Sequence, residues 1–137
     1  MKFENSPLSE RFSFSKLELP FGNFFLCENF IISEIYEGVH FDMDKIIFAA
    51  KEIIAFYGED AKLAYISNRT NSYSTDPQDW ANITANSNQL VATAIVSYNQ
   101  MGRLNANLEK HFSKLEMHIC YSLEEAVTWV NSLKVLA

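Results

Sequence analysis

Residues 90–96 read Leu-Val-Ala-Thr-Ala-Ile-Val, and residues 63–67 read Leu-Ala-Tyr-Ile-Ser. Both are short runs in which apolar residues follow one another almost without interruption. Such runs are typical of strands that are covered on both faces, as in the parallel sheets of α/β proteins. We therefore predict that residues 63–67 and 90–96 form parallel central strands covered by helices, with Ala94 and Ile95 almost fully buried.

The segment before these two runs has the period of a helix. Asp42 or Asp44 is placed to cap this helix at its start, and Gly58 is placed to end it. The apolar residues that recur at helical spacing are Ile46, Ala50, Ile53, Ile54 and Tyr57. Because this spacing puts them on one stripe, we expect the helix to pack that stripe against the sheet.

Three more helices are predicted downstream. One follows Asp76, has Pro77 in its first turn, and directs Trp80 and Ile83 inward. The next carries Met101, Leu104, Leu108 and Phe112 at helical spacing. The last begins at residues 122–125, where Ser-Leu-Glu-Glu forms a capping box.

The first part of the chain contains three segments with the character of strands. Residues 11–19 alternate between polar and apolar types, and residues 24–27 and 30–36 are aromatic and β-branched. Very short connections join the three, which favours antiparallel pairing. Residues 115–121 also alternate, with one face more polar, and are therefore predicted to be an edge strand.

This order of elements predicts an α/β fold. The mixed sheet should have antiparallel strands at its N-terminal side, followed by parallel βα units, with about four helices in total. Residues 1–11 are mostly polar and are expected to form a flexible N-terminus. Residues 12–137 are expected to form a single domain, which is the usual unit for a chain of this length.

Charge and composition exclude several classes of protein. The net charge is −6, and the 11 basic residues are scattered rather than clustered, so we expect no binding to nucleic acid. No apolar stretch is long enough to span a bilayer or to form the core of a signal peptide, so we expect no membrane insertion and a cytoplasmic location.

Metal and cofactor chemistry is not predicted either. His40, His111 and His118 have no other ligand type at the spacing of a metal site. With 4 glycines in the chain, a phosphate-binding loop is not expected. Cys27 and Cys120 lie in apolar runs and are expected to be buried free thiols.

Three segments are similar to one known family. They read Asn-Phe-Ile-Ile at 29–32 with Tyr-Glu-Gly at 36–38, Ala-Thr-Ala-Ile-Val at 92–96, and Cys-Tyr-Ser-Leu-Glu-Glu-Ala-Val-Thr-Trp-Val at 120–130. Over residues 12–133 the chain resembles the STAS domain, the module shared by anti-sigma-factor antagonists and sulfate-transporter tails, and its SpoIIAA-like group in particular. The resemblance implies a bacterial regulatory module that acts by binding a protein partner or a second copy, without catalysis.

The polar segment 68–75 is the candidate site. It follows the carboxyl end of a predicted central strand, where open α/β sheets tend to bind ligands. Its side chains are expected to face solvent and to contact a partner or ligand through Asn68, Arg69, Asn71, Tyr73 and Ser74. Regulatory STAS domains carry a phosphorylated Ser or Thr in an Asp-Ser-Ser/Thr-Gly type turn. This segment lacks that motif but offers Ser74 and Thr75 as possible phosphorylation sites.

Two functions remain open at this point. The first is the non-enzymatic protein-interaction module that the resemblance implies. The alternative is a binder or carrier of a small apolar or amphipathic ligand, as in SEC14-like proteins, because aromatic residues make up 14% of the chain. An enzyme is not expected, since no nucleophile and base are recognisable.

Overall fold

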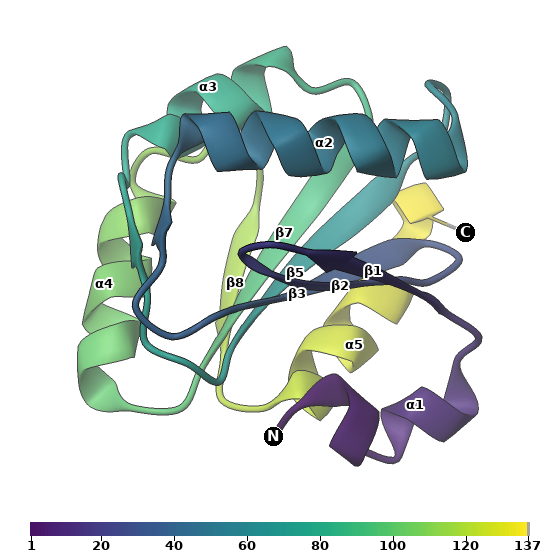
Figure 1. Ribbon diagram of the computed structural model, residues 1–137, viewed down its shortest axis with the longest axis horizontal. Coiled ribbons are helices and arrows are strands. Elements are labelled where there is room, and N and C mark those ends of the chain that lie inside the picture. The colour runs from purple at the N-terminus through teal and green to yellow at the C-terminus, as the bar shows by residue number, and fades with distance from the viewer. Residues whose placement is uncertain (137) are drawn as a thin grey trace.

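Six strands form one mixed sheet in the computed structural model, which describes residues 1–136 (Figure 1). Their order across the sheet is β1-β2-β3-β5-β7-β8. The strands are β1 (Ser15–Leu19), β2 (Gly22–Leu26), β3 (Phe30–Ile35), β5 (Leu63–Arg69), β7 (Leu90–Ser97) and β8 (Met117–Cys120). The first three pair antiparallel, and β3, β5, β7 and β8 pair parallel. The predicted α/β class with a mixed sheet is thus confirmed.

The two central strands lie where the apolar runs placed them. In the register of β5 with β7, Ser67 lies opposite Ile95 and Ile66 opposite Ala94. Ala94 and Ile95 are fully buried, as predicted. β8 is the last strand of the sheet, which confirms the predicted edge strand near residues 115–121.

Four helices of eight or more residues cover the sheet: α2 (Met43–Tyr57), α3 (Asp79–Asn86), α4 (Gln100–Lys110) and α5 (Leu123–Asn131). From β3 to β5, β7 and β8, each crossover moves one strand in the same direction. Because such crossovers are right-handed, α2, α3 and α4 all lie on one face of the sheet. Figure 1 shows α5 on the other face, together with the N-terminal segment.

Shorter elements complete the structure. A two-stranded ladder pairs β4 (His40–Phe41) with β6 (Ser74–Thr75) in parallel. The remaining elements are the helical turns η1 (Phe3–Asn5), α1 (Leu8–Arg11) and η2 (Lys134–Leu136).

The ends of α2 and the start of α5 follow capping residues that the sequence contains, whereas α3 begins at Asp79 with no side-chain cap from Asp76. The Asp42 side chain accepts a hydrogen bond from the Lys45 backbone N–H at 3.2 Å, and Gly58 ends α2 with a φ of 86°. Ser122 accepts from the Glu125 N–H at 3.1 Å at the start of α5. These contacts confirm Asp42, Gly58 and Ser122 as capping residues, whereas the Glu125 carboxylate reaches back to the Tyr121 N–H at 3.4 Å and not to that of Ser122, as a capping box would require.

The N-terminal segment differs from the prediction. Phe3 and Leu8 are buried in the core that α5 covers, and the Phe3 and Phe14 rings meet edge to face with centroids 4.9 Å apart. The Phe3 N–H also donates to the Glu34 carboxylate at 2.7 Å. A flexible terminus over residues 1–11 does not fit this packing, because two apolar side chains among polar neighbours anchor the segment. At the other end of the predicted domain, Ala137 lies outside the described residues.

Cys27 and Cys120 are free and buried, as predicted. Burial raises the pKa of both thiols to about 12, so both stay protonated and unreactive at neutral pH. Among residues 1–136, none of the helices combines the length and the apolar character that crossing a bilayer requires.

Candidate functional site

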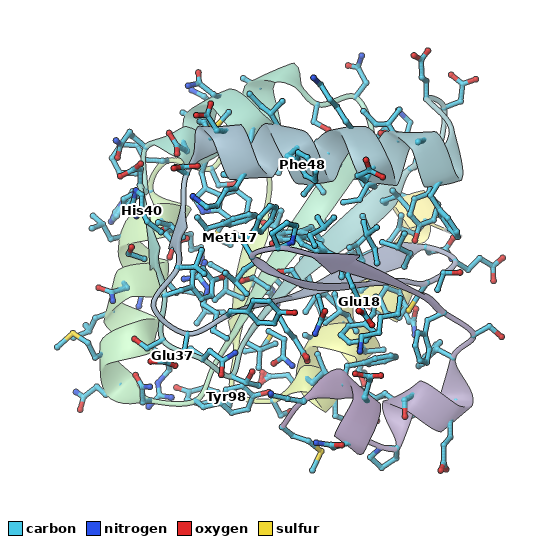
Figure 2. The ribbon with its side chains drawn as sticks, in the orientation of Figure 1. Glu18, Glu37, His40, Phe48, Tyr98 and Met117 are labelled. Carbon is cyan, nitrogen blue, oxygen red and sulfur yellow. The ribbon has the colours of Figure 1, made fainter. Side chains whose placement is uncertain are left out.

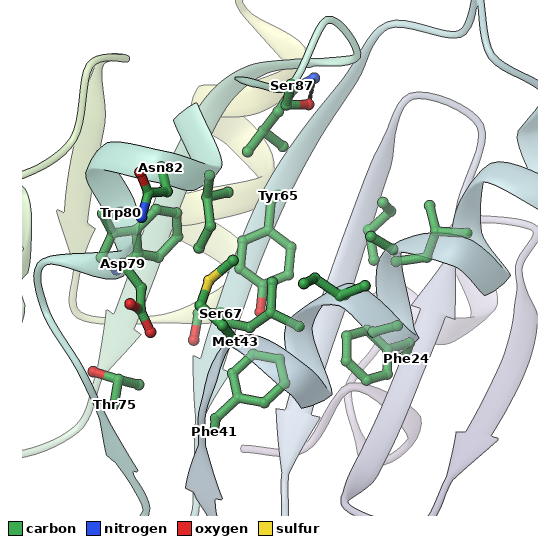
Figure 3. Close-up of a pocket in the computed structure, with 18 of the residues that line it drawn as sticks. Phe24, Phe41, Met43, Tyr65, Ser67, Thr75, Asp79, Trp80, Asn82 and Ser87 are labelled. Atoms are coloured by element: carbon green, nitrogen blue, oxygen red, sulfur yellow. Dashed lines mark hydrogen bonds between the residues drawn. The ribbon is translucent and has the colours of Figure 1, made fainter. Parts of the chain in front are cut away.

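A cavity of about 440 Å³ lies between α2 and α3. It lies over β3, β5 and β7, on the face of the sheet that α2, α3 and α4 cover. Figure 3 shows it from the Ser87 end to the end formed by Phe41 and Thr75. Apolar side chains form most of its wall, among them Phe24, Ile31, Phe41, Ile46, Ile53 and Ile83. The volume falls within the range of small-molecule sites, about 300–1,000 Å³.

The residues of α2 explain why this space remains. Ala49 is the one fully buried residue of the helix, and Ala49 and Ala50 both line the cavity. Their methyl groups are too short to fill the distance between the helix and the sheet. The larger Ile46 and Ile53 reach toward the sheet on either side of them, so they hold the helix in place while the cavity persists between them.

Hydroxyl groups gather at one end of the cavity. Tyr73 and Ser67 share a hydrogen bond of 2.8 Å between their hydroxyl oxygens, and Tyr65 and Ser33 share one of 2.6 Å. Tyr65, Ser67 and Tyr73 line the cavity. Burial raises the pKa of Tyr65, with a further contribution from Tyr73, so its hydroxyl stays protonated at neutral pH. This end therefore offers neutral hydrogen-bonding groups.

A buried ion pair lies beside these hydroxyl groups. Both terminal nitrogens of Arg69 donate to the Glu109 carboxylate, one of them at 2.7 Å. Trp80 Nε1 donates to the same carboxylate at 2.8 Å, and Arg69 Nε donates to Ser67 at 3.0 Å. The side chain of Arg69 is 14% exposed and that of Glu109 is 2% exposed. Three elements, β5, α3 and α4, thus meet at one charge pair beside the cavity.

Two carboxylates stand at the same end of the cavity. Asp76 and Asp79 line it, and Figure 3 labels Asp79. His40 Nε2 lies 3.1 Å from the Asp76 carboxylate. His40 Nδ1 also bonds the Ser74 hydroxyl at 2.7 Å. Burial raises the pKa of Asp79, and repulsion from Asp76 adds to the rise.

The structure separates the predicted site residues into two groups. Arg69 and Tyr73 line the cavity, and so does Thr75. Asn68 faces the other side of the sheet, where its amide donates to Glu34 at 2.8 Å. Asn71 donates to a backbone carbonyl of β3 at 3.0 Å, so both asparagines hold the chain in place.

Asn68 also belongs to a network around the N-terminus. The Tyr98 hydroxyl donates to the Asn68 side-chain oxygen at 2.7 Å and lies 3.3 Å from the Met1 carbonyl (Figure 2). Ser74 is exposed and Thr75 is half-buried. Their phosphorylation stays a prediction.

The expectation that this segment faces solvent does not fit Arg69. Strand β5 continues through Arg69, two residues beyond the apolar run, and its side chain is bonded on three nitrogens to internal partners. The period of a strand places Ser67 and Arg69 on the cavity side and Asn68 on the opposite side. The predicted strand ended at Ser67, two residues too early, because the residues that follow it are polar.

Sequence reasoning missed Glu109. Its signal lies in α4, where Gly102, Ala106 and Glu109 recur at helical spacing and face the sheet. A Cβ atom on Gly102 would come within 2.3 Å of the Ser97 hydroxyl, so this side of α4 is pressed against β7. Small residues spaced along one side of a helix indicate that this side packs closely against the sheet. A carboxylate on the same side is buried and therefore requires a partner.

No cluster of three or more potential metal ligands occurs within residues 1–136. No protein-family model, no curated protein and no solved structure matches this chain. The resemblance to STAS domains therefore stays a prediction.

We predict that Arg69→Ala strongly destabilises the protein, because it leaves the Glu109 carboxylate buried without its cation. Removing one partner of a buried pair typically costs about 3–5 kcal/mol of unfolding free energy. The double substitution Arg69→Met with Glu109→Leu should recover part of that loss, since no charge stays unpaired, although the Trp80 Nε1–H loses its acceptor at a cost of about 1–3 kcal/mol. Urea unfolding of the three proteins measures both effects. A loss below about 1 kcal/mol for Arg69→Ala would show that the pair is not buried in solution.

Proposed function

We propose that this protein binds a small apolar or amphipathic ligand in the cavity between α2 and α3, and that it does so without catalysis. The observation that carries the proposal is the cavity itself, which is large enough for a small molecule and apolar along most of its wall. Burial of apolar ligand surface would supply the affinity, about 0.8 kcal/mol for each methylene group. The hydroxyl groups at one end would orient the ligand.

The polar groups of the cavity fit a binding role better than a catalytic one. The Ser67 hydroxyl bonds the Tyr73 hydroxyl and accepts from Arg69, and a serine in such surroundings is not activated as a nucleophile. Arg69 is held by Glu109 and is not free to polarise a substrate. A STAS-like, SEC14-related identity is part of this proposal, and the mixed sheet with βα units supports it.

A second candidate is the protein-interaction module, and one observation favours it. The apolar stripe of α4 faces solvent, with Met101 65%, Leu104 57% and Leu108 51% exposed. The spacing is that of a helix-pairing seam, and uncharged Gln100, Asn105 and Asn107 flank it. A second copy of this chain fits such a stripe, because a two-fold axis would set the same apolar patch against itself.

Filling part of the cavity should weaken ligand binding. Ala50 lines the cavity from α2 and is not buried in the core, so Ala50→Trp adds an indole to the cavity without removing a core side chain. Octanol is a suitable probe, and its binding is measured by titration calorimetry. Displacing two methylene groups from the cavity should weaken binding about tenfold or more.

The matched control is Ala55→Trp. Ala55 lies on the same helix and is exposed, but it does not line the cavity, so its substitution should leave octanol binding unchanged. Equal affinities for both variants and the wild type would place octanol elsewhere and contradict the proposal.

The second candidate predicts self-association through α4. Replacing Leu104 and Leu108 together by Gln should convert a dimer to a monomer in sedimentation velocity, while unfolding free energy changes by only about 0.5 kcal/mol per exposed site. Val135→Gln, at another exposed apolar residue, is the control and should leave the dimer intact. A wild-type protein that remains monomeric at every concentration would rule out this candidate.

A further inference from the structure

The cavity wall contains more acidic than basic side chains, and these side chains differ in their hydrogen-bond partners. Arg69, Asp76 and Asp79 are the charged residues that line it. Arg69 is the one cation of this set, and the Glu109 carboxylate already occupies both of its terminal nitrogens. An anionic ligand would have to displace a 2%-exposed carboxylate that Trp80 also holds. The cavity therefore has no cation to offer.

The two aspartates differ in their partners. Asp76 has His40 at 3.1 Å. Asp79 is half-buried and accepts no side-chain hydrogen bond from the residues that the structure describes, and attraction to His40 only partly offsets the rise of its pKa that burial and Asp76 cause. Figure 3 shows Asp79 at the same end of the cavity as Ser67 and Thr75, where its carboxylate borders the space available to a ligand. A partly buried carboxylate without a donor is costly, and a cation supplied by a ligand would offset this cost.

We infer that the cavity selects apolar ligands that carry a protonated amine, with Asp79 as the residue that binds the amine. This inference rests on the proposed function, because it names the chemical class of ligand for the same cavity. The apolar part of the ligand lies along α2 and β5, and the ammonium group lies between Asp79 and the hydroxyl of Thr75 or Ser67. Ligands with a carboxylate are rejected, because Asp76 and Asp79 repel them and Arg69 is occupied.

The test compares three probes that share one alkyl chain and differ in the head group: octylamine, octanol and octanoate. Titration calorimetry at neutral pH gives the three dissociation constants. Octylamine should bind roughly fivefold tighter than octanol, the upper end of what one partly exposed ion pair contributes, and octanoate should bind weakest. Asp79→Asn should remove the advantage of octylamine, so that the ratio of the octanol and octylamine dissociation constants falls from about five to about one.

Glu52→Gln is the matched control. It removes one negative charge from an exposed position of α2 that does not line the cavity, so it reports any attraction that comes only from the net charge of −6. The inference is supported if Asp79→Asn, and not Glu52→Gln, abolishes the preference for the amine. Octanoate binding as tightly as octylamine, or the same loss in both variants, would overturn it while the proposed function stands. If none of the three probes binds, the proposed function is contradicted as well.

Discussion

The ion pair between Arg69 and Glu109 determines how one face of this protein is built. Because Glu109 must point inward to reach Arg69 and Trp80, α4 is rotated so that its small residues press against β7. The apolar stripe that begins at Met101 is consequently left on the outside. In the same pair, Glu109 neutralises Arg69, which is the cation of the cavity wall. One buried contact thus sets both the exposed surface of α4 and the electrostatics of the cavity.

The cavity itself results from the composition of α2. This helix is rich in apolar residues, and Ile47, Phe48 and Phe56 are exposed on it. Figure 2 labels Phe48 on α2. Its contact with the sheet, in contrast, is made largely through alanine methyl groups, Ile46, Ile53 and Tyr57, whose hydroxyl donates to the Cys27 carbonyl. The helix is thus fixed at these few points, and the cavity occupies the space that they leave.

Local patterns were sufficient for the framework of the fold. The central strands, the capping residues Asp42 and Gly58, and the edge strand depend on neighbours in the sequence, and each was predicted from them. The cavity was not predicted, because its existence depends on the distance between α2 and α3.

The rotation of α4 was not predicted either. Helical spacing groups Met101 with Leu104 and Leu108, but it does not determine whether they face the sheet or solvent. The burial of Phe3 and Leu8 was not predicted, because each is a single apolar residue among polar neighbours and forms no periodic pattern. Of the candidate site, Arg69 and Tyr73 do line the cavity, yet their internal bonds depend on partners far along the chain.

The most direct measurement of ligand binding beneath α2 is a methyl NMR titration with octanol. Ile46 and Ile83 line the cavity from two different helices, whereas Ile32 is buried on the opposite face of the sheet. We expect the methyl resonances of Ile46 and Ile83 to shift together and to saturate at one dissociation constant, while those of Ile32 stay in place. Saturating shifts confined to the exposed leucines of α4, with Ile46 and Ile83 unchanged, would contradict this expectation.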